Sequence, residues 1–113
     1  MLLILAIIFF SLAAILGLYL LTYVLTEKHT PKGVAIIHGS TASLGLVLLI
    51  IYSLLYQTPT ASLIVFILAA LGGLYLFYRD ITGKEIPKLL AIGHGSIAII
   101  GFILLIVFTF YYF

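Results

Sequence analysis

Residues 31–50 read PKGVAIIHGSTASLGLVLLI, and residues 87–106 read PKLLAIGHGSIAIIGFILLI. The two stretches lie 56 positions apart and share their proline, their lysine, their histidine and two glycines without a gap. An apolar composition raises the number of chance identities between two such segments, but it does not align Pro, His and Gly. The chain is therefore predicted to contain an internal duplication.

The duplication extends outward from these stretches over most of the chain. With the same shift of 56 positions, residues 12–56 match residues 68–112 at 22 of 45 positions. The matches include Gly17-Leu18-Tyr19-Leu20 on Gly73-Leu74-Tyr75-Leu76. We therefore divide the single domain, 1–113, into a first repeat at 1–57 and a second at 58–113.

The composition indicates that lipid surrounds this chain. Hydrophobic residues make up 65% of the 113 residues and charged residues only 7%, whereas a soluble domain carries roughly 25% charged residues. So few charged side chains cannot cover a water-facing surface. The chain has no cysteine, which excludes a disulfide framework and a thiolate metal site.

Short polar breaks divide the chain into four apolar runs, each long enough to span a bilayer as a helix. The expected helices lie at about 2–27, 32–56, 60–79 and 87–112. Pro31, Pro59 and Pro87 stand in the breaks, where a proline fits the start of a helix. Because backbone polar groups cannot be left open in lipid, we predict an all-α integral membrane four-helix bundle made of two parallel helical-hairpin repeats.

The basic residues predict the orientation of this bundle. All five of them fall in the first and third breaks, which share one side of an up-down-up-down bundle: Lys28, Lys32, Arg79, Lys84 and Lys88. The positive-inside rule then places these two loops in the cytoplasm and both termini outside. The expected location is a bacterial-type inner (plasma) membrane, with the chain as a multi-pass protein.

One histidine per repeat lies inside the membrane. His38 and His94 each follow their helix-starting proline by seven residues, which is roughly 10 Å into the helix. A parallel repeat puts both side chains at one depth. The second and fourth helices of a bundle wound in chain order are diagonal partners, so two inward-pointing imidazoles would face each other across the pseudo-twofold axis.

Small residues surround each histidine on its helix face. The lane on the second helix holds Ala35, Ala42 and Gly45, and the equivalent lane on the fourth holds Ala91, Ala98 and Gly101. The first and third helices add Ala13-x-x-x-Gly17 and Ala69-x-x-x-Gly73. Such lanes serve close helix packing in lipid, or they clear a slot for a flat ligand. Both interpretations remain open at this point.

Two opposed histidines and a flat slot suggest haem b, because neutral imidazole is a common ligand of haem iron. The metal-ligand candidates are His38 and His94. Lys32 and Lys88 lie in first helical turns, where a cation opposes the helix dipole, so we consider them as partners of the haem propionates. Contact with lipid headgroups and a topology signal explain these lysines equally well.

The motifs His38-Gly39-Ser40 and His94-Gly95-Ser96 resemble the membrane b-type cytochromes, of the respiratory cytochrome b and cytochrome b561 kind. The resemblance implies a haem between transmembrane histidines, glycines such as Gly39 and Gly95 flanking the ring, and an electron-transfer or quinone-linked role. Those families typically hold two haems with four histidines. Only two histidines lie in the membrane here, so the chain would hold one haem.

Other functions compete with haem binding. The histidines could be structural, each bonded to a carbonyl or tyrosine of a neighbouring helix. A small four-helix transporter needs a carboxylate inside the membrane, whereas Glu27, Asp80 and Glu85 are all expected at the cytoplasmic loops. A ligand-free anchor or assembly subunit is a third alternative.

The expected partners follow from these alternatives. They are the lipid bilayer, a quinone or a redox partner protein, and a second copy of the chain in a homodimer. Any enzymatic activity would be haem-dependent redox chemistry. We expect no nucleic-acid binding, because the chain offers no platform for it.

Overall fold

The computed structural model describes residues 1–112, and Phe113, the last residue of the second repeat, lies outside the described residues. Within this range the chain forms α1 (Leu2–Leu25), α2 (Lys32–Leu55), α3 (Thr60–Ile81) and α4 (Lys88–Tyr112). All four helices are long and apolar enough to cross a membrane. The all-α four-helix membrane architecture predicted from the sequence is confirmed.

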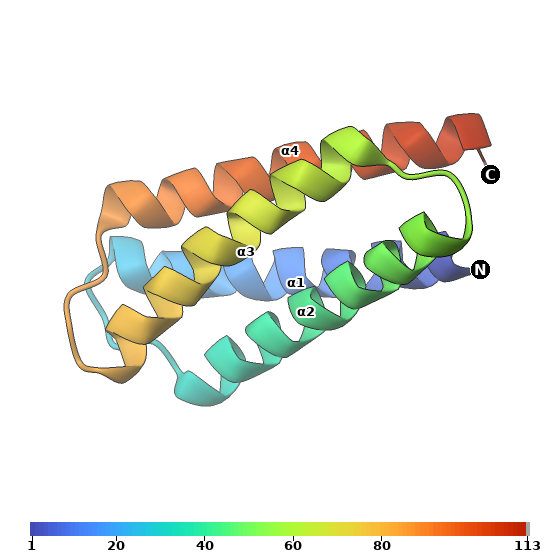
Figure 1. The fold of residues 1–113 in the computed structure, drawn as a ribbon. Coiled ribbons are helices and arrows are strands. Elements are labelled where there is room, and N and C mark those ends of the chain that lie inside the picture. Colours follow the sequence, from blue (N-terminus) through green and yellow to red (C-terminus); the bar gives the residue numbers. More distant parts are fainter. Residues whose placement is uncertain (113) are drawn as a thin grey trace.

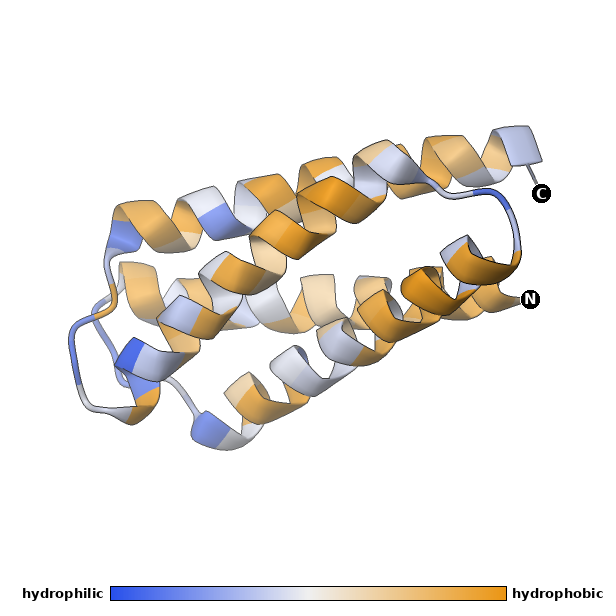
Figure 2. Ribbon diagram, viewed as in Figure 1, coloured by the Kyte–Doolittle hydropathy of each residue, from blue (hydrophilic) through white to orange (hydrophobic). Residues whose placement is uncertain are grey.

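The two ends of the bundle differ in the basic residues that they carry, and Figures 1 and 2 show which connections lie at each end. Both termini and the α2–α3 connection lie at one end, which we call the terminal end. The α1–α2 and α3–α4 connections lie at the other end with Lys28, Lys32, Arg79, Lys84 and Lys88, and we call it the basic end. The hydrophilic residues gather at the connections, and apolar residues dominate the helices between them.

The helices form a square arrangement in which neighbours in sequence are neighbours in space. α1 packs against α2 and α4, and α3 packs against α2 and α4. Neither α1 with α3 nor α2 with α4 makes a backbone-level contact among the described residues. The helices that carry His38 and His94 are therefore diagonal, as the sequence predicted.

Each helix turns one stripe of residues toward the interior, with alternating spacings of three and four. The stripes hold buried or half-buried positions: Leu3, Ala6, Phe10, Ala13 and Gly17 on α1; Ala35, His38, Ala42, Gly45 and Leu49 on α2; Ser62, Phe66, Ala69 and Gly73 on α3; Ala91, His94, Ala98, Gly101 and Leu105 on α4. This spacing is that of coiled-coil-like bundles. It points two diagonal pairs of stripes at each other across the bundle axis.

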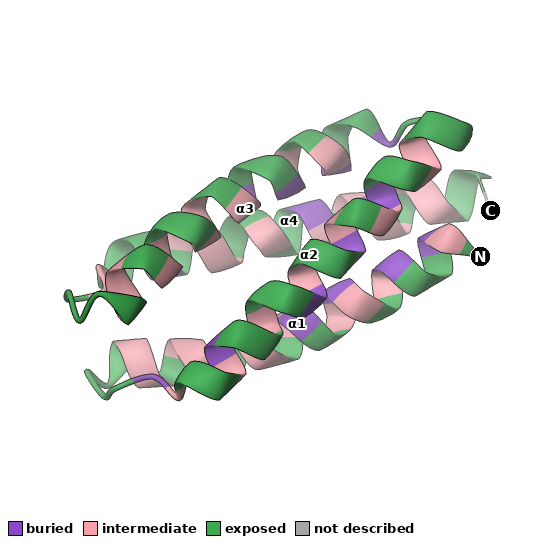
Figure 3. Ribbon diagram, turned by 60° about the horizontal axis from the view of Figure 1, so that its bottom comes forward, coloured by how far each residue is buried: buried purple, intermediate pink, exposed green. Residues whose placement is uncertain are grey.

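The large buried side chains occupy the terminal half of the bundle. Leu3, Leu49 and Leu105 are fully buried there, and Phe10 and Phe66 pack against the same cluster. Toward the basic end the buried positions on the four stripes are alanines, at Ala13, Ala35, Ala69 and Ala91. Figure 3 shows buried residues on the inner faces and exposed ones outside. The fully buried large side chains therefore lie in only one half of the bundle.

The helices before the two basic-end connections end in the same way. Glu27 and Gly83, which are repeat equivalents, both adopt a positive φ, of 58° and 74°. The backbone N–H of Lys28 donates to the Tyr23 carbonyl at 2.9 Å, and that of Lys84 donates to the Arg79 carbonyl at 2.9 Å. This is the Schellman arrangement. It ends α1 at Leu25, two residues before the expected boundary, whereas α3 continues to Ile81, two residues beyond it.

Candidate functional site between the diagonal helices

Each histidine is held by a hydrogen bond to the other helix of its own hairpin. His38 Nδ1 lies 2.8 Å from the Ala13 carbonyl oxygen, and His94 Nδ1 lies 2.8 Å from the Ala69 carbonyl oxygen. A carbonyl oxygen can only accept, so Nδ1 is the protonated nitrogen that donates. In a neutral imidazole this leaves the lone pair on Nε2. Both rings therefore have the tautomer that histidine adopts when Nε2 ligates a metal.

The two imidazoles approach each other across the α2–α4 diagonal. Their ring centroids are 6.3 Å apart, and their planes are nearly perpendicular at 88°. The repeat accounts for this arrangement, because each imidazole makes the equivalent hydrogen bond at the same depth in the bundle. We call the pair, with the carbonyls of Ala13 and Ala69 and the adjacent Gly17 and Gly73, the histidine layer.

Gly17 and Gly73 make room for the two rings. A Cβ atom at Gly17 would lie 2.9 Å from His38 Cε1, and one at Gly73 would lie 2.9 Å from His94 Cε1. Each imidazole therefore lies directly on the backbone of the adjacent helix. The small-residue lanes of α1 and α3 are therefore close-packing surfaces, which is one of the two interpretations of the sequence. The group that packs against each lane is the imidazole of the histidine.

The glycines on the histidine helices face phenyl rings. A Cβ at Gly45 would lie 3.1 Å from the ring of Phe10, and one at Gly101 would lie 3.2 Å from the ring of Phe66. The two phenyl rings stack in parallel, with centroids 3.9 Å apart at 3°. Gly45 and Gly101 thus support an aromatic stack on the terminal side of the histidines.

The other small residues named from the sequence form three pairs that differ in burial. Ala35 and Ala91 are buried beside the histidines, on the basic side, and Ala42 and Ala98 are half-buried. Gly39 and Gly95 have open space where a Cβ would project. The glycine that follows each histidine is therefore not packed against another helix.

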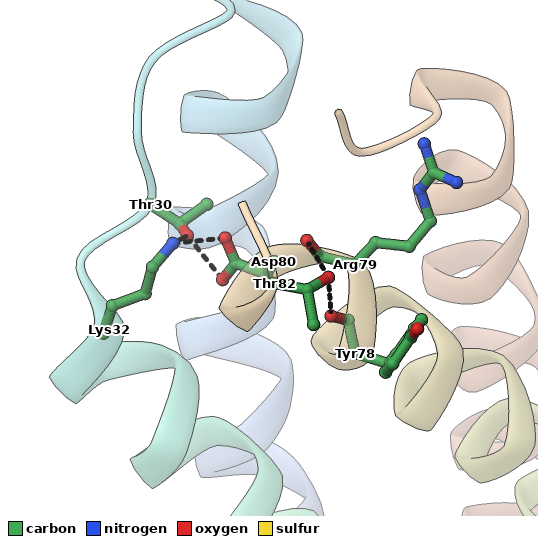
Figure 4. Close-up of polar contacts among 6 residues, drawn as sticks. All are labelled: Thr30, Lys32, Tyr78, Arg79, Asp80 and Thr82. Carbon is green, nitrogen blue, oxygen red and sulfur yellow. Dashed lines mark hydrogen bonds and ion pairs between the residues drawn. The ribbon is translucent and has the colours of Figure 1, made fainter. Parts of the chain in front are cut away.

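The lysines at the helix starts bind carboxylates of the protein itself, and Figure 4 shows this for Lys32. Lys32 pairs with Asp80, whose other oxygen accepts a hydrogen bond from Thr30 Oγ1 at 2.6 Å. Lys32 Nζ also donates to Thr30 Oγ1 at 3.0 Å. Lys88 Nζ lies 3.2 Å from Glu27 Oε1.

Asp80 corrects one expectation from the sequence. It does not lie in the loop but in the last turn of α3, and its side chain is only 10% exposed. A signal for this was present, because Asp80 continues the three-four spacing of Ser62, Phe66, Ala69 and Gly73. Phe10 continues the spacing of Ala13 and Gly17 in the same way, and it too could have been found from the stripe.

Together, fold and site define a class: a four-helix membrane protein with a pseudo-twofold pair of histidines between its diagonal helices. No family model, curated protein or solved structure matches the chain.

Proposed function

We propose that this chain is a small membrane haem b protein, with His38 and His94 as the two axial ligands of one haem. The observation that carries the proposal is the pair of imidazoles at 6.3 Å, both with Nδ1 committed to a carbonyl. A metal–imidazole bond of about 2 Å on each side, with the half-width of each ring added, needs about 6 Å between ring centroids. The observed separation of the centroids is close to this value.

The surroundings of the histidine layer support a flat, largely apolar ligand. On its basic side the buried stripe positions are the small residues Ala35 and Ala91, while Ala13 and Ala69 lie at the layer itself. On its terminal side the stack of Phe10 and Phe66 closes the bundle. A macrocycle between the histidines would therefore extend toward the basic end, where Lys32 and Lys88 would receive its carboxylates in exchange for Asp80 and Glu27.

The residues of this chain would hold and tune the group. A bound haem supplies one-electron transfer, which suits an electron-transfer or quinone-linked redox role. The carbonyls of Ala13 and Ala69 would fix both imidazoles and raise the basicity of Nε2. Gly17 and Gly73 would set the ring positions, because they allow each imidazole to lie on the neighbouring backbone.

A structural role for the histidines is the second candidate, and the same hydrogen bonds favour it. An imidazole that donates to Ala13 or Ala69 joins the two helices of its hairpin without any ligand. This candidate leaves both Nε2 atoms without a described protein partner, whereas haem ligation uses them. A transporter gains little support, because Asp80, the carboxylate nearest the bundle interior, is paired with Lys32.

The proposal includes an orientation in the membrane. The basic end would face the cytoplasm of a bacterial-type inner membrane, and both termini would lie outside. The support is the positive-inside rule, since the described loop at the terminal end, residues 56–59, carries no Lys or Arg.

Absorption spectroscopy tests the proposal. The protein, purified in detergent and supplied with haemin, should show a Soret band that shifts on reduction and is lost in His38→Ala and in His94→Ala. His29→Ala is the matched control, because His29 is exposed in the α1–α2 loop, and it should keep the spectrum. In His94→Met, haem should remain bound with a higher reduction potential. A colourless protein that takes up no haemin, with both alanine variants merely less stable, would favour the structural role.

A further inference from the structure

Two ion pairs connect the hairpins at the basic end. Lys32 of the first hairpin pairs with Asp80 of the second, and Lys88 of the second pairs with Glu27 of the first. Thr30 adds a hydrogen bond to Asp80 and is itself buried. We call these five residues, Glu27, Thr30, Lys32, Asp80 and Lys88, the polar clasp.

The internal repeat does not account for the clasp. Lys32 and Lys88 are repeat equivalents, but their partners are not, since Asp80 corresponds to Val24 and Glu27 corresponds to Gly83. Each lysine thus pairs with a carboxylate of the opposite hairpin, and the two carboxylates stand at positions that are not repeat equivalents. Both ion pairs therefore join the two hairpins, although the repeat does not relate the positions of their carboxylates.

The packing of the bundle makes the basic end the one that can open. The fully buried leucines Leu3, Leu49 and Leu105 and the Phe10–Phe66 stack join the hairpins at the terminal end. Between the histidine layer and the clasp, the buried stripe positions are only Ala35 and Ala91, and Leu20, Val24 and Leu76, which continue the stripes of α1 and α3, are half-buried. Alanine offers little surface for the dispersion contacts that hold helices together in lipid.

We infer that the polar clasp is a releasable closure of the histidine layer. The two hairpins separate at the basic end while the terminal core stays packed, and this motion opens a path from the basic-end surface to His38 and His94. This opening does not depend on which ligand the histidine layer binds. A role of this opening in haem entry rests on the proposed function. In that case the two carboxylates of the haem compete with Asp80 and Glu27 for Lys32 and Lys88.

Distance measurements between spin labels test the closure without any haem. The chain has no cysteine, so paired cysteines can be labelled without background. His29→Cys with Lys84→Cys reports the basic end, and Leu55→Cys with Tyr111→Cys reports the terminal end; all four residues are exposed. In the Asp80→Asn/Glu27→Gln variant, the basic-end distances should shift upward by several ångströms and broaden, with the terminal-end distances unchanged.

A matched control and a second measurement make the result unambiguous. Glu85→Gln removes an exposed carboxylate of the same end that makes no ion pair in the described chain, and it should leave both distances as they are. Raising the salt concentration on the labelled chain without clasp substitutions should broaden the basic-end distances alone, since salt screens the exposed pair of Lys88 and Glu27. Unchanged basic-end distances in the double variant and at high salt, or equal broadening at both ends, would overturn the inference. Neither outcome depends on whether the protein binds haem.

Discussion

At the scale of single residues, each imidazole of the histidine layer is positioned by two contacts. One is the hydrogen bond from Nδ1 to a carbonyl, and the other is the approach of the ring to a glycine backbone. Both contacts come from the other helix of the same hairpin. The position of each ring is therefore set within its repeat, and the distance between the rings is set by how the repeats pack.

Alanine at Gly17 or Gly73 should displace the imidazole. A Cβ only 2.9 Å from Cε1 forces the ring off the backbone, and overpacking of this kind costs about 1–3 kcal/mol. We expect lower stability in SDS titrations followed by circular dichroism, and weaker haemin binding. Gly39→Ala is the control, because that position has open space. Equal stability and equal haemin binding in Gly17→Ala and Gly39→Ala would contradict the close contact between the imidazole and the backbone of α1.

At the scale of the elements, the aromatic stack joins two helices that make no backbone-level contact. Phe10 of α1 and Phe66 of α3 meet across the diagonal, with their rings 3.9 Å apart. Each ring is seated on a glycine of an adjacent helix, Gly45 or Gly101. The stack thus connects all four helices in one layer.

Truncation of this stack should weaken the whole bundle. Phe10→Ala removes a buried ring and leaves a cavity beside Gly45, a change that typically costs about 3–5 kcal/mol. SDS-induced unfolding measures the loss, and Ile8→Ala, at an exposed site on the same helix, should have little effect. Equal effects of the two variants would mean that the stack does not carry the packing of this layer.

The helix ends predict a further difference between two glycines. Gly83 has a φ of 74°, and an L-residue in this left-handed region costs about 1–2 kcal/mol. Gly83→Ala should therefore destabilise α3 by about 1 kcal/mol in the same unfolding assay. Gly93→Ala places the same methyl group in open space within α4 and should be neutral or slightly stabilising. Equal effects of the two substitutions would argue against the left-handed turn.

At the scale of the whole molecule, the four helices have one closed end and one polar end. The bundle measures 42 × 23 × 19 Å, and its long dimension exceeds the roughly 30 Å of a bilayer core. The charged residues then lie near one membrane surface, while the terminal core lies near the other. The gathering of the basic residues at one end supports the proposed orientation.

Labelling of single cysteines tests that orientation. In spheroplasts of a bacterial host, a membrane-impermeant maleimide should react with Thr58→Cys in the α2–α3 loop and not with Lys84→Cys at the basic end. Both sites are exposed, so disruption of the membrane should make the second react as well. Labelling of Lys84→Cys in intact spheroplasts would show that the basic end faces outside, opposite to the proposed orientation.

Much of this molecule could be predicted from its sequence. Lipid permits few folds, so apolar length defined the helices to within two residues, and the repeat placed His38 and His94 on diagonal helices. The partners across helices could not be predicted, because they depend on helix rotation and register. Gly45, for which close packing and a ligand slot were both open, faces Phe10. Lys32 binds Asp80, which continues the α3 stripe beyond its expected end.

The internal duplication has an evolutionary consequence. In a dimer of identical hairpins, one substitution would alter both sides of the histidine layer at once. In this chain the sides mutate separately, and they have already diverged: Gly72, near the ring of His94, corresponds to Leu16, and the buried Thr41 corresponds to the exposed Ile97. With both copies in one chain, each histidine can have its own surroundings while the backbone that holds it keeps the same geometry.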